Sequence, residues 1–336
     1  MNKVLNQDIQ DFLRYCKFTD ELQESSFLVT GATGLLGSTL IRCLQSLDKQ
    51  IRIEAPVRNL QKAEMMFQDG NVHFWECDLQ TYDYERLPAV DYIVHCAAPT
   101  ASRYFVEQPV ETVESIVGIS SSLLRYAYRK SVKGFLFLSS LEVYGHICTD
   151  TPLLEEHIGD LSLADVRSSY PYAKRMVEHL CYLYAKEYGV NTKIMRLTQT
   201  TGAGIAMDDN RVIAQFVRLA TQGKDIVLHT TGESARPYCY TVDAILAMLY
   251  ILLRGKPGEA YNVANNTTFI SALDLAKFIQ RNYCPHISVK MKLQDTCYAP
   301  TSRLPLSTEK LESLGWQPHY SLHDIISRLI DYMRDI

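Results

Sequence analysis

The chain has 336 residues, of which 47% are hydrophobic, and a formal net charge of -4. A chain of this length and composition can bury the core of one large domain or of two closely associated ones. The slight negative charge excludes a broad basic surface, so we expect no nucleic-acid partner, although a local arginine pocket for a small anion stays possible.

Nine cysteines are spread along the chain without a Cys-x-x-Cys pair. An odd number of cysteines, most of them in apolar runs, is typical of reduced and buried thiols rather than of a disulfide framework or a zinc site. The longest apolar stretch, residues 244–253, is shorter than the ~20 residues that a spanning helix needs. The N-terminus lacks the basic start and apolar core of a signal peptide. The sequence therefore predicts a cytoplasmic protein with no metal site and no membrane partner.

Residues 1–25 carry Ile9, Phe12 and Leu22 at roughly helical spacing, which predicts a helix packed on the edge of a domain rather than a partner-binding arm. Short apolar runs then alternate with helical patterns. Strands are expected at residues 27–29, 51–57, 72–77, 92–97, 135–139 and 193–197. This alternation favours a parallel sheet with helices on both faces.

The pattern changes after about residue 200, where loops at residues 200–210 and 230–237 separate shorter elements. Strands are expected at residues 226–228 and 260–263, and helices at residues 212–222, 242–253 and 271–280. The predicted fold class is α/β: a Rossmann-type doubly wound parallel sheet with a smaller C-terminal α/β substrate-binding lobe over the carboxyl ends of the strands. We expect an N-terminal helical extension (1–25), an NAD(P)-binding domain (26–200), and a mainly substrate-binding lobe (201–336) that is interleaved with it.

A glycine-rich turn follows the first predicted strand and precedes a helical pattern, as a dinucleotide-binding motif requires. Gly31 permits the tight turn, Gly34 lets the chain approach a pyrophosphate, and Gly37 lets the helix lie close to the strand. The other expected cofactor-binding residues of the motif are Thr33, Leu35 and Leu36. The pyrophosphate would then meet the positive end of the helix.

The end of the second strand bears on the choice between NAD and NADP. An acidic residue normally stands there to bind the adenosine ribose, but this strand ends at Arg58, and Glu54 falls inside the run. A cation at Arg58 suits a 2′-phosphate, so NADP stays open beside NAD; an exposed loop arginine is the alternative. Asp78 can accept a hydrogen bond from the adenine amino group or can form a turn. Leu79 and Ala97 are further expected cofactor-binding residues, and Tyr170 and Lys174 complete the set.

Tyr170 and Lys174 lie four positions apart, so on a helix they project from the same face. A tyrosine is a poor base at neutral pH, and a neighbouring ammonium is expected to lower its pKa. The pair can take a proton from a sugar hydroxyl while hydride leaves for a nicotinamide. Ser140, at the end of the fifth strand, can share the hydrogen bond of that hydroxyl. Glu142 can act as a general base or an electrostatic group, or it can be a surface or capping carboxylate.

Arg211, Arg236 and Arg303 lie in the expected lobe over the site. Guanidinium groups bind phosphate oxygens in pairs, and a nucleotide diphosphate needs at least one of them; solvated surface arginines are the alternative.

Together these residues resemble an extended short-chain dehydrogenase/reductase of the sugar-nucleotide epimerase/dehydratase type, over residues 26–330. The resemblance rests on the glycine turn, Ser140 with residues 143–145, Tyr170 with Lys174, residues 236–243 and residues 314–318. It implies a nucleotide-diphosphate sugar as substrate and a homodimer, since dimerisation through two helices, one of which contains Tyr170, is common in the family.

Within this family the chain is most similar to UDP-glucuronate decarboxylases, at residues 95–104, 109–112, 167–170 and 209–212. The resemblance implies that Tyr170 and Lys174 drive oxidation of the sugar C4 hydroxyl, with Ser140 assisting and Glu142 as the active-site glutamate. It also implies that Ser102 and Tyr104 line the sugar site and that Arg211 and Arg236 help to hold the nucleotide.

The chain also departs from that subgroup. Arg58 stands where the subgroup has an aspartate, Gln199 where it has an asparagine, and residues 203–204 where it has Pro-Arg. Leu141 stands where dTDP-glucose dehydratases carry a proton-donating aspartic acid, so their dehydration route is disfavoured. A 4-epimerase, a dehydratase, a 4-keto reductase and, in another class, a non-catalytic NAD(P)-sensing protein remain as alternatives.

Overall fold

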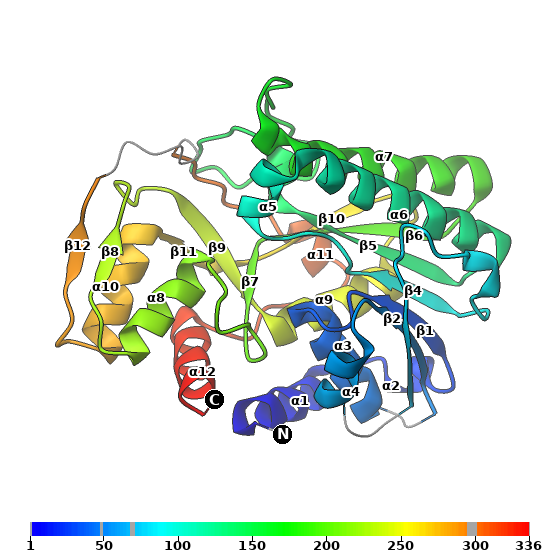
Figure 1. Ribbon diagram of the computed structural model, residues 1–336, viewed down its shortest axis with the longest axis horizontal. Coiled ribbons are helices and arrows are strands. Elements are labelled where there is room, and N and C mark those ends of the chain that lie inside the picture. The colour runs from blue at the N-terminus through cyan, green and yellow to red at the C-terminus, as the bar shows by residue number, and fades with distance from the viewer. Residues whose placement is uncertain (1, 48–49, 68–70, 294–300, 336) are drawn as a thin grey trace.

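The computed structural model describes residues 2–47, 50–67, 71–293 and 301–335. Its centre is a seven-stranded parallel sheet in the order β10-β6-β5-β4-β1-β2-β3 (Figure 1). The strands are β1 (Ser26–Thr30), β2 (Arg52–Val57), β3 (Val72–Glu76), β4 (Tyr92–His95), β5 (Gly134–Ser140), β6 (Thr192–Leu197) and β10 (Ala260–Val263). The order reverses between β1 and β4, which is where doubly wound sheets bind their ligands. The predicted Rossmann-type fold class is confirmed.

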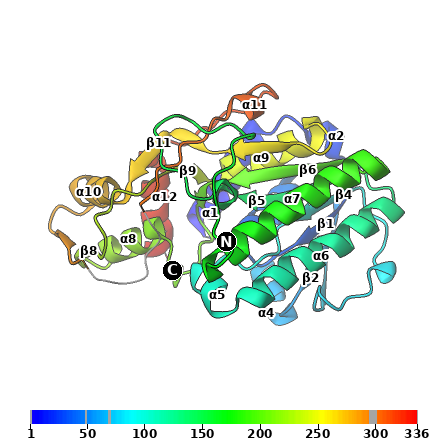
Figure 2. The ribbon, with the colours of Figure 1, turned by 90° about the horizontal axis from the view of Figure 1, so that it is seen from above.

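Helices cover both faces of this sheet, which explains why its central strands are apolar on both sides. On one face α6 (Pro109–Arg129) and α7 (Ser169–Tyr188) lie side by side (Figures 1 and 2). On the other face α9 (Thr241–Arg254) packs against β5, β6 and α3 (Leu35–Leu47). Every residue of α9 from Thr241 to Leu252 is buried, so the longest apolar stretch of the sequence is a core helix.

The predicted N-terminal helix is confirmed as α1 (Lys3–Tyr15), which packs on α3, α9 and α12 (Leu322–Arg334). Phe12 is fully buried in this contact. Arg328 of α12 donates hydrogen bonds to both Asp8 and Asp11 of α1, each at 2.5 Å. The two ends of the chain are therefore joined by a buried charge cluster.

A second group of elements stands beside the carboxyl ends of β5 and β6 and contains two small sheets (Figure 1). One has the order β11-β9-β7 and the other pairs β12 with β8. Their strands are β7 (Gln199–Thr201), β8 (Ile226–Leu228), β9 (Ala235–Tyr240), β11 (Asn265–Ser271) and β12 (Val289–Met291), with helices α8 (Val212–Thr221) and α10 (Ala272–Tyr283). The division into domains at residues 25 and 200 stays a prediction, and β10 and α9 belong to the main sheet and its cover.

The prediction of loops at residues 200–210 and 230–237 is partly wrong, because β7 and the start of β9 fall within them. The sequence pattern does not reveal either strand, because β7 has only three residues and β9 contains Pro237, which cannot donate a backbone hydrogen bond to a β-ladder. Long-range contacts stabilise them instead. The hydroxyl of Thr198 donates to the carbonyl of Pro237 at 2.6 Å, and Tyr238 N donates to the hydroxyl of Thr268 at 2.7 Å.

The remaining elements are short. They are α2 (Thr19–Leu22), α4 (Leu60–Met66), η1 (Tyr84–Arg86), α5 (Ser102–Glu107), η2 (Leu141–Tyr144), η3 (Val166–Ser168) and α11 (Glu309–Glu312). The eight cysteines within the described residues are free thiols, and the ninth, Cys297, lies outside them. None of the helices in the described ranges is long and apolar enough to cross a membrane.

Candidate functional site

The glycine turn joins β1 to α3 in a conformation that side chains would prevent. Gly31 has a φ of 71°, and a Cβ atom on it would lie 2.9 Å from the backbone nitrogen of Ala97. A Cβ atom on Gly37 would lie 2.3 Å from the carbonyl oxygen of Gly31. The turn thus brings bare backbone and the N-terminus of a helix to the switch point of the sheet, and it fits the pyrophosphate of a dinucleotide.

A chain of hydrogen bonds fastens this turn to β4. Ala97 N donates to the hydroxyl of Thr30 at 3.1 Å, and that hydroxyl lies 2.7 Å from Nδ1 of His95. Nε2 of His95 lies 3.0 Å from the hydroxyl of Ser120 in α6, which donates onward to the carbonyl of Ile116. Burial lowers the pKa of His95 to about 3, so the ring is neutral. Ala97 is thereby held beside Gly31, as the predicted cofactor site requires.

The residues predicted to contact the adenosine half lie at the ends of β2 and β3. Arg58 is exposed and follows β2 directly, whereas Glu54 is buried inside the strand and lies 2.8 Å from Nδ1 of His73. Asp78 is exposed after β3, and its carboxylate accepts a hydrogen bond from Gln80 N at 2.9 Å. Asp78 therefore forms a turn, one of the two roles that the sequence left open.

Tyr170 lies in the first turn of α7 and is 7% exposed. Burial raises its pKa above the ordinary value, the charge of Glu142 raises it further, and a hydrogen bond with the side chain of Ser140 lowers it. The expectation of a lowered pKa is thus wrong for the protein without ligand, because desolvation outweighs the favourable contacts. The predicted pairing of Tyr170 with Ser140 is present.

Lys174 follows Tyr170 by one helical turn and is buried beneath it. Its ammonium donates to the carbonyl of Leu138 in β5 at 2.7 Å and lies 5.6 Å from the centre of the Tyr170 ring. Burial lowers the pKa of Lys174 to about 8, and the carboxylate of Glu178 opposes this shift. The structure therefore brings Tyr170, Lys174 and Ser140 together at the carboxyl end of β5.

Glu142 stands two residues after Ser140 in η2, and its backbone nitrogen donates to the Ser140 hydroxyl at 3.2 Å. Burial raises the pKa of Glu142, while the charges of Arg167 and Arg236 lower it. Arg236, predicted to bind the nucleotide, thus lies near the predicted catalytic carboxylate. Its guanidinium also donates to the carbonyl and the hydroxyl of Ser302.

The other two predicted arginines are held by carboxylates. Arg211 is half-buried and pairs with Asp209 at 2.8 Å, while it also donates to the carbonyl of Thr200 at 2.6 Å. Arg303 donates to Asp150 at 2.7 Å and lies over the ring of Phe269. Unlike Arg236, neither of these arginines is one of the charges that lower the pKa of Glu142. The role of Arg211 and Arg303 in phosphate binding stays a prediction.

Ser102 and Tyr104, predicted to line the sugar site, lie in α5. Ser102 is exposed and Tyr104 is half-buried. Phe105, from the same helix, stacks on Tyr170 with ring centroids 4.2 Å apart. This stacking places α5 against the predicted catalytic tyrosine.

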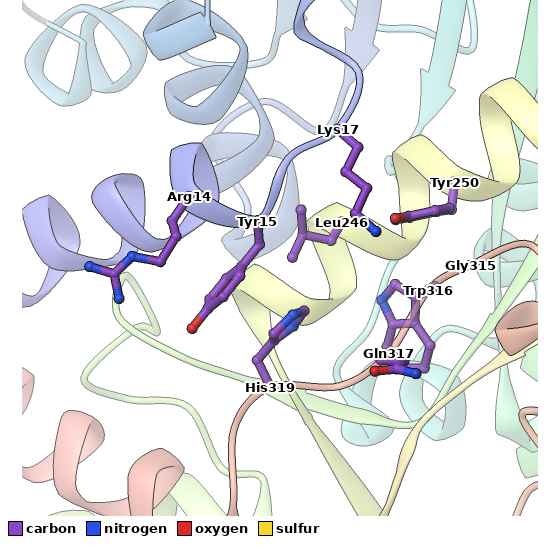
Figure 3. A pocket seen from close by; sticks show the side chains of 9 residues that line it. All are labelled: Arg14, Tyr15, Lys17, Leu246, Tyr250, Gly315, Trp316, Gln317 and His319. Carbon is purple, nitrogen blue, oxygen red and sulfur yellow. The ribbon is translucent and has the colours of Figure 1, made fainter.

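A pocket of about 260 Å³ lies elsewhere, between α1, α9 and residues 315–319. Figure 3 shows Tyr15 and His319, whose rings stack, among its lining residues. It contains none of the predicted site residues. In the described ranges no group of three or more His, Cys, Asp or Glu side chains could hold a metal ion.

Sequence reasoning missed four contributors to this site: Phe105, His95, Glu178 and Arg196. Glu178 alone carried a readable signal, because it follows Lys174 by four residues and so shares its helix face. The stacking of Phe105 and the link from His95 to Ser120 depend on tertiary packing that no local pattern encodes.

Curated relatives of this chain include decarboxylases. It is 27% identical over 300 residues to UDP-glucuronic acid decarboxylase 6 of Arabidopsis thaliana, a match that covers 88% of this chain and 85% of that protein. It is 26% identical over 322 residues to UDP-glucuronic acid decarboxylase 1 of Xenopus tropicalis, covering 95% of this chain and 74% of that protein.

Solved structures with the same fold include other enzymes of sugar nucleotides. UDP-glucose 4-epimerase from Thermotoga maritima, solved with UDP-glucose, superposes with a TM-score of 0.80 at 22% identity, covering 92% of this chain and 98% of that one. A dTDP-glucose 4,6-dehydratase from Streptomyces venezuelae with NAD bound gives a TM-score of 0.78 at 22% identity, covering 92% and 97%. These likenesses concern the fold.

The model of one protein family, described as the NAD dependent epimerase/dehydratase family, matches residues 27–264. This range contains the glycine turn, Ser140, Tyr170 and Lys174. The matches agree with the prediction of an NAD-dependent sugar-nucleotide-modifying enzyme, and the predicted family and cofactor class are confirmed. The chain belongs to the NAD dependent epimerase/dehydratase family.

Proposed function

We propose that this protein is a sugar-nucleotide decarboxylase that acts on UDP-glucuronate or a closely similar uronic acid. One observation carries the proposal: Tyr170 is hydrogen-bonded to Ser140, with Lys174 buried close by, and Glu142 lies near them under the influence of the charges of Arg167 and Arg236. The first three residues suit oxidation of a hydroxyl. The two cations suit a substrate that carries negative charge near the reacting carbon.

The first step is proton transfer from the C4 hydroxyl of the sugar. Tyr170 accepts this proton as a phenolate, whose charge the ammonium of Lys174 stabilises, and the hydroxyl of Ser140 orients the substrate oxygen. A bound nicotinamide would supply the acceptor for the C4 hydride and, later, the donor that gives it back. The residues that would hold this cofactor are those of the glycine turn, with Ala97 beside them.

Decarboxylation then follows from the chemistry of the substrate. The C4 ketone is β to the carboxylate on C5, so the bond between C5 and the carboxyl carbon can break and carbon dioxide can leave. The electron pair of that bond passes into the enolate, which Tyr170 and Ser140 stabilise by hydrogen bonds to its oxygen. C5 then takes up a proton from solvent water, and the protonated Tyr170 returns its proton to O4 as the ketone is reduced. The net reaction consumes one solvent proton and releases one carbon dioxide, with no net change in the cofactor.

Leu141 supports this assignment over dehydration. It stands between Ser140 and Glu142 and is 3% exposed, packed in a small core with Val143, Leu153 and Leu306. A buried leucine cannot protonate a leaving hydroxyl. Elimination of water by the route of the dTDP-glucose dehydratases therefore lacks its acid at this position.

A second candidate is 4-keto reduction or 4-epimerisation by the same Tyr170 and Lys174. Arg58 favours it, because an exposed cation directly after β2 suits the 2′-phosphate of NADPH. A reductase consumes NADPH in proportion to product, whereas a decarboxylase and an epimerase leave the cofactor unchanged. Absorbance thus identifies the reductase, and the mass of the product, which an epimerase does not change, separates the epimerase from the decarboxylase.

We also propose a homodimer formed by α6 and α7, in the cytoplasm as the sequence predicts. Both helices leave large apolar side chains in solvent: Val110 is 61% exposed and Val113 37% exposed on α6, and Met176 is 51% and Leu183 39% exposed on α7. The two helices lie side by side (Figure 2), and we infer that their exposed apolar side chains contribute to one face. Pairing this face with its copy would bury it.

The direct test is incubation of the protein with NAD and UDP-glucuronate, followed by mass spectrometry of the nucleotide product. We expect a UDP-pentose and one carbon dioxide per substrate consumed. UDP-glucose, which lacks the carboxylate, serves as the matched control and should give no pentose. Turnover of UDP-glucose or of a 4-keto sugar, with none of UDP-glucuronate, would reject decarboxylation.

A further inference from the structure

Glu178 is a buried carboxylate on the same face of α7 as Tyr170 and Lys174. It is 8% exposed and follows Lys174 by one helical turn. Its Oε2 accepts a hydrogen bond from Nη2 of Arg196 at 2.7 Å, and its Oε1 accepts one from the hydroxyl of Ser139 at 2.5 Å. These hydrogen bonds hold the buried carboxylate in one position, so its electrostatic effect on neighbouring groups is fixed as well.

The partners of Glu178 tie α7 to the sheet. Ser139 lies in β5 and pairs in register with Arg196 of β6. Nη1 of Arg196 donates to the carbonyl of Glu155 at 2.6 Å and to the hydroxyl of Tyr144 at 3.2 Å. Arg196 is therefore fixed by three groups, and Glu178 cannot turn away from Lys174 without leaving a buried guanidinium without its carboxylate partner.

Three parts of the structure contribute the groups that face Lys174. Among these groups, Glu178 raises the pKa of Lys174 most and so favours its charged form. From α7 these are Tyr170, Glu178 and the thiol of Cys181; from β4 and the segment after it, neutral His95 and the thiol of Cys96; and from β5, the carbonyl of Leu138 and the ring of Phe137. Both thiols are buried, and burial raises the pKa of each, so they are neutral. Among these groups Glu178 is the only carboxylate, and it lies one helical turn from Lys174.

We propose that Glu178 is a positioning residue for catalysis: its carboxylate keeps the ammonium of Lys174 charged, and Arg196 and Ser139 fix the carboxylate in place. The inference rests on the proposed function only in that a charged Lys174 is needed to support the Tyr170 phenolate. Glu178 contacts neither substrate nor cofactor in this account. Its effect reaches the reaction through Lys174.

The first test measures Lys174 itself, with no substrate or cofactor. The protein is labelled with carbon-labelled lysine, the Lys174 signal is assigned with Lys174→Met, and its titration is followed by NMR. In Glu178→Gln, which keeps the size of the side chain but removes its charge and replaces one acceptor oxygen with an amide donor, we expect the midpoint of Lys174 to fall by at least about one pH unit. Asp8→Asn is the matched control, because it neutralises a buried, arginine-paired carboxylate far along the chain and should leave the midpoint unchanged.

The second test uses the pH dependence of turnover. The alkaline limb of kcat/KM should move to lower pH in Glu178→Gln and should return toward that of the unmodified protein in Glu178→Asp, which restores the charge. Should Glu178→Gln fail to fold, the double variant Glu178→Leu with Arg196→Met removes both charges without leaving either unpaired. We expect it, too, to lower the midpoint of Lys174.

The outcomes separate this inference from the proposed function. A folded Glu178→Gln or double variant in which Lys174 titrates as in the unmodified protein would overturn the inference, whatever the substrate. A lowered midpoint without turnover of UDP-glucuronate by the unmodified protein would uphold the inference and reject the decarboxylase assignment.

Discussion

The ring of Phe105 stacks on the ring of Tyr170, with centroids 4.2 Å apart and planes inclined by 11°. The contact is supported by the hydroxyl of Ser169, which donates to the carbonyl of Phe105 at 3.2 Å. It links α5, the helix that carries Ser102 and Tyr104, to α7, which carries the proposed catalytic pair Tyr170 and Lys174. The orientation of the Tyr170 hydroxyl therefore depends on a side chain that has no chemistry of its own.

We predict that Phe105→Leu lowers kcat by roughly ten- to a hundredfold, because a small misplacement of Tyr170 suffices for such a loss. The affinity for NAD, measured by isothermal titration calorimetry, should stay within about twofold, since Phe105 is remote from the glycine turn in sequence and contacts the phenol. Phe74→Leu is a matched control, since Phe74 belongs to another aromatic pair, with Phe67. Equal losses of kcat in the two variants would contradict the role of the stacking.

Arg58 provides a test of cofactor preference. If its guanidinium binds the 2′-phosphate, Arg58→Asp should weaken NADP binding by about ten- to a hundredfold, the range of a charge-assisted hydrogen bond, and should change NAD binding little. Arg52→Asp at the opposite end of β2 is the control and should affect both cofactors alike. Equal affinity of Arg58→Asp and the unmodified protein for NADP, by fluorescence titration, would show that Arg58 is only a surface arginine.

Asp8 gives the stability of the fold a pH dependence. Burial raises its pKa from 3.8 to about 6, against the opposing charge of Arg328. The folded state thus holds this proton more tightly than the unfolded chain. The contribution of Asp8 to folding stability is fully present below about pH 4 and is lost as the pH rises through about 6. This loss lowers the free energy of unfolding by about 3 kcal/mol.

Asp8→Asn, which is neutral at every pH, should lack this dependence. Urea unfolding between about pH 4 and pH 7 should show the stability of the unmodified protein falling relative to that of Asp8→Asn as the pH rises. Asp20→Asn, on an exposed position, is the control. A difference between Asp8→Asn and the unmodified protein that is the same at every pH would disprove this titration.

The proposed dimer predicts the effect of a charge on the face of α6 and α7. Val113→Glu should convert the protein to a monomer in size-exclusion chromatography with light scattering, because a pair of carboxylates would have to be buried at the symmetry axis or near it. Met65→Glu changes an equally apolar side chain, 67% exposed on α4, and should leave the oligomeric state unchanged. A Val113→Glu protein with the mass of the unmodified one would exclude this interface.

The main sheet could be predicted from the sequence because its strands are short apolar runs separated by amphipathic helices. The predicted strand at residues 260–263 coincides with β10, and residues 226–228 coincide with β8. The strands β7, β9 and β11 escaped prediction, since they are stabilised by pairing across long stretches of sequence and by side-chain hydrogen bonds such as that of Thr268. The local sequence pattern does not encode such long-range contacts.

Some residues of the candidate site could likewise be found from the sequence, and others could not. Gly31, Tyr170 and Lys174 could be found from spacing, because a turn and a helix face are local. The position of Arg236 near Glu142 depends on how the second group of elements meets the first. The pairing of Arg211 with Asp209 is a local contact between residues two positions apart. The raised pKa of Tyr170 likewise follows from its burial, which spacing alone does not reveal.

The central claim is that Tyr170 begins the reaction by taking the C4 proton as hydride leaves. It is tested most directly by rapid mixing of the protein and NAD with UDP-glucuronate, while the near-ultraviolet absorbance of reduced nicotinamide is followed. We predict a transient of reduced cofactor in the unmodified protein and none in Tyr170→Phe, although both bind NAD equally well. A Tyr170→Phe protein that reduces its cofactor at the unmodified rate would contradict the account.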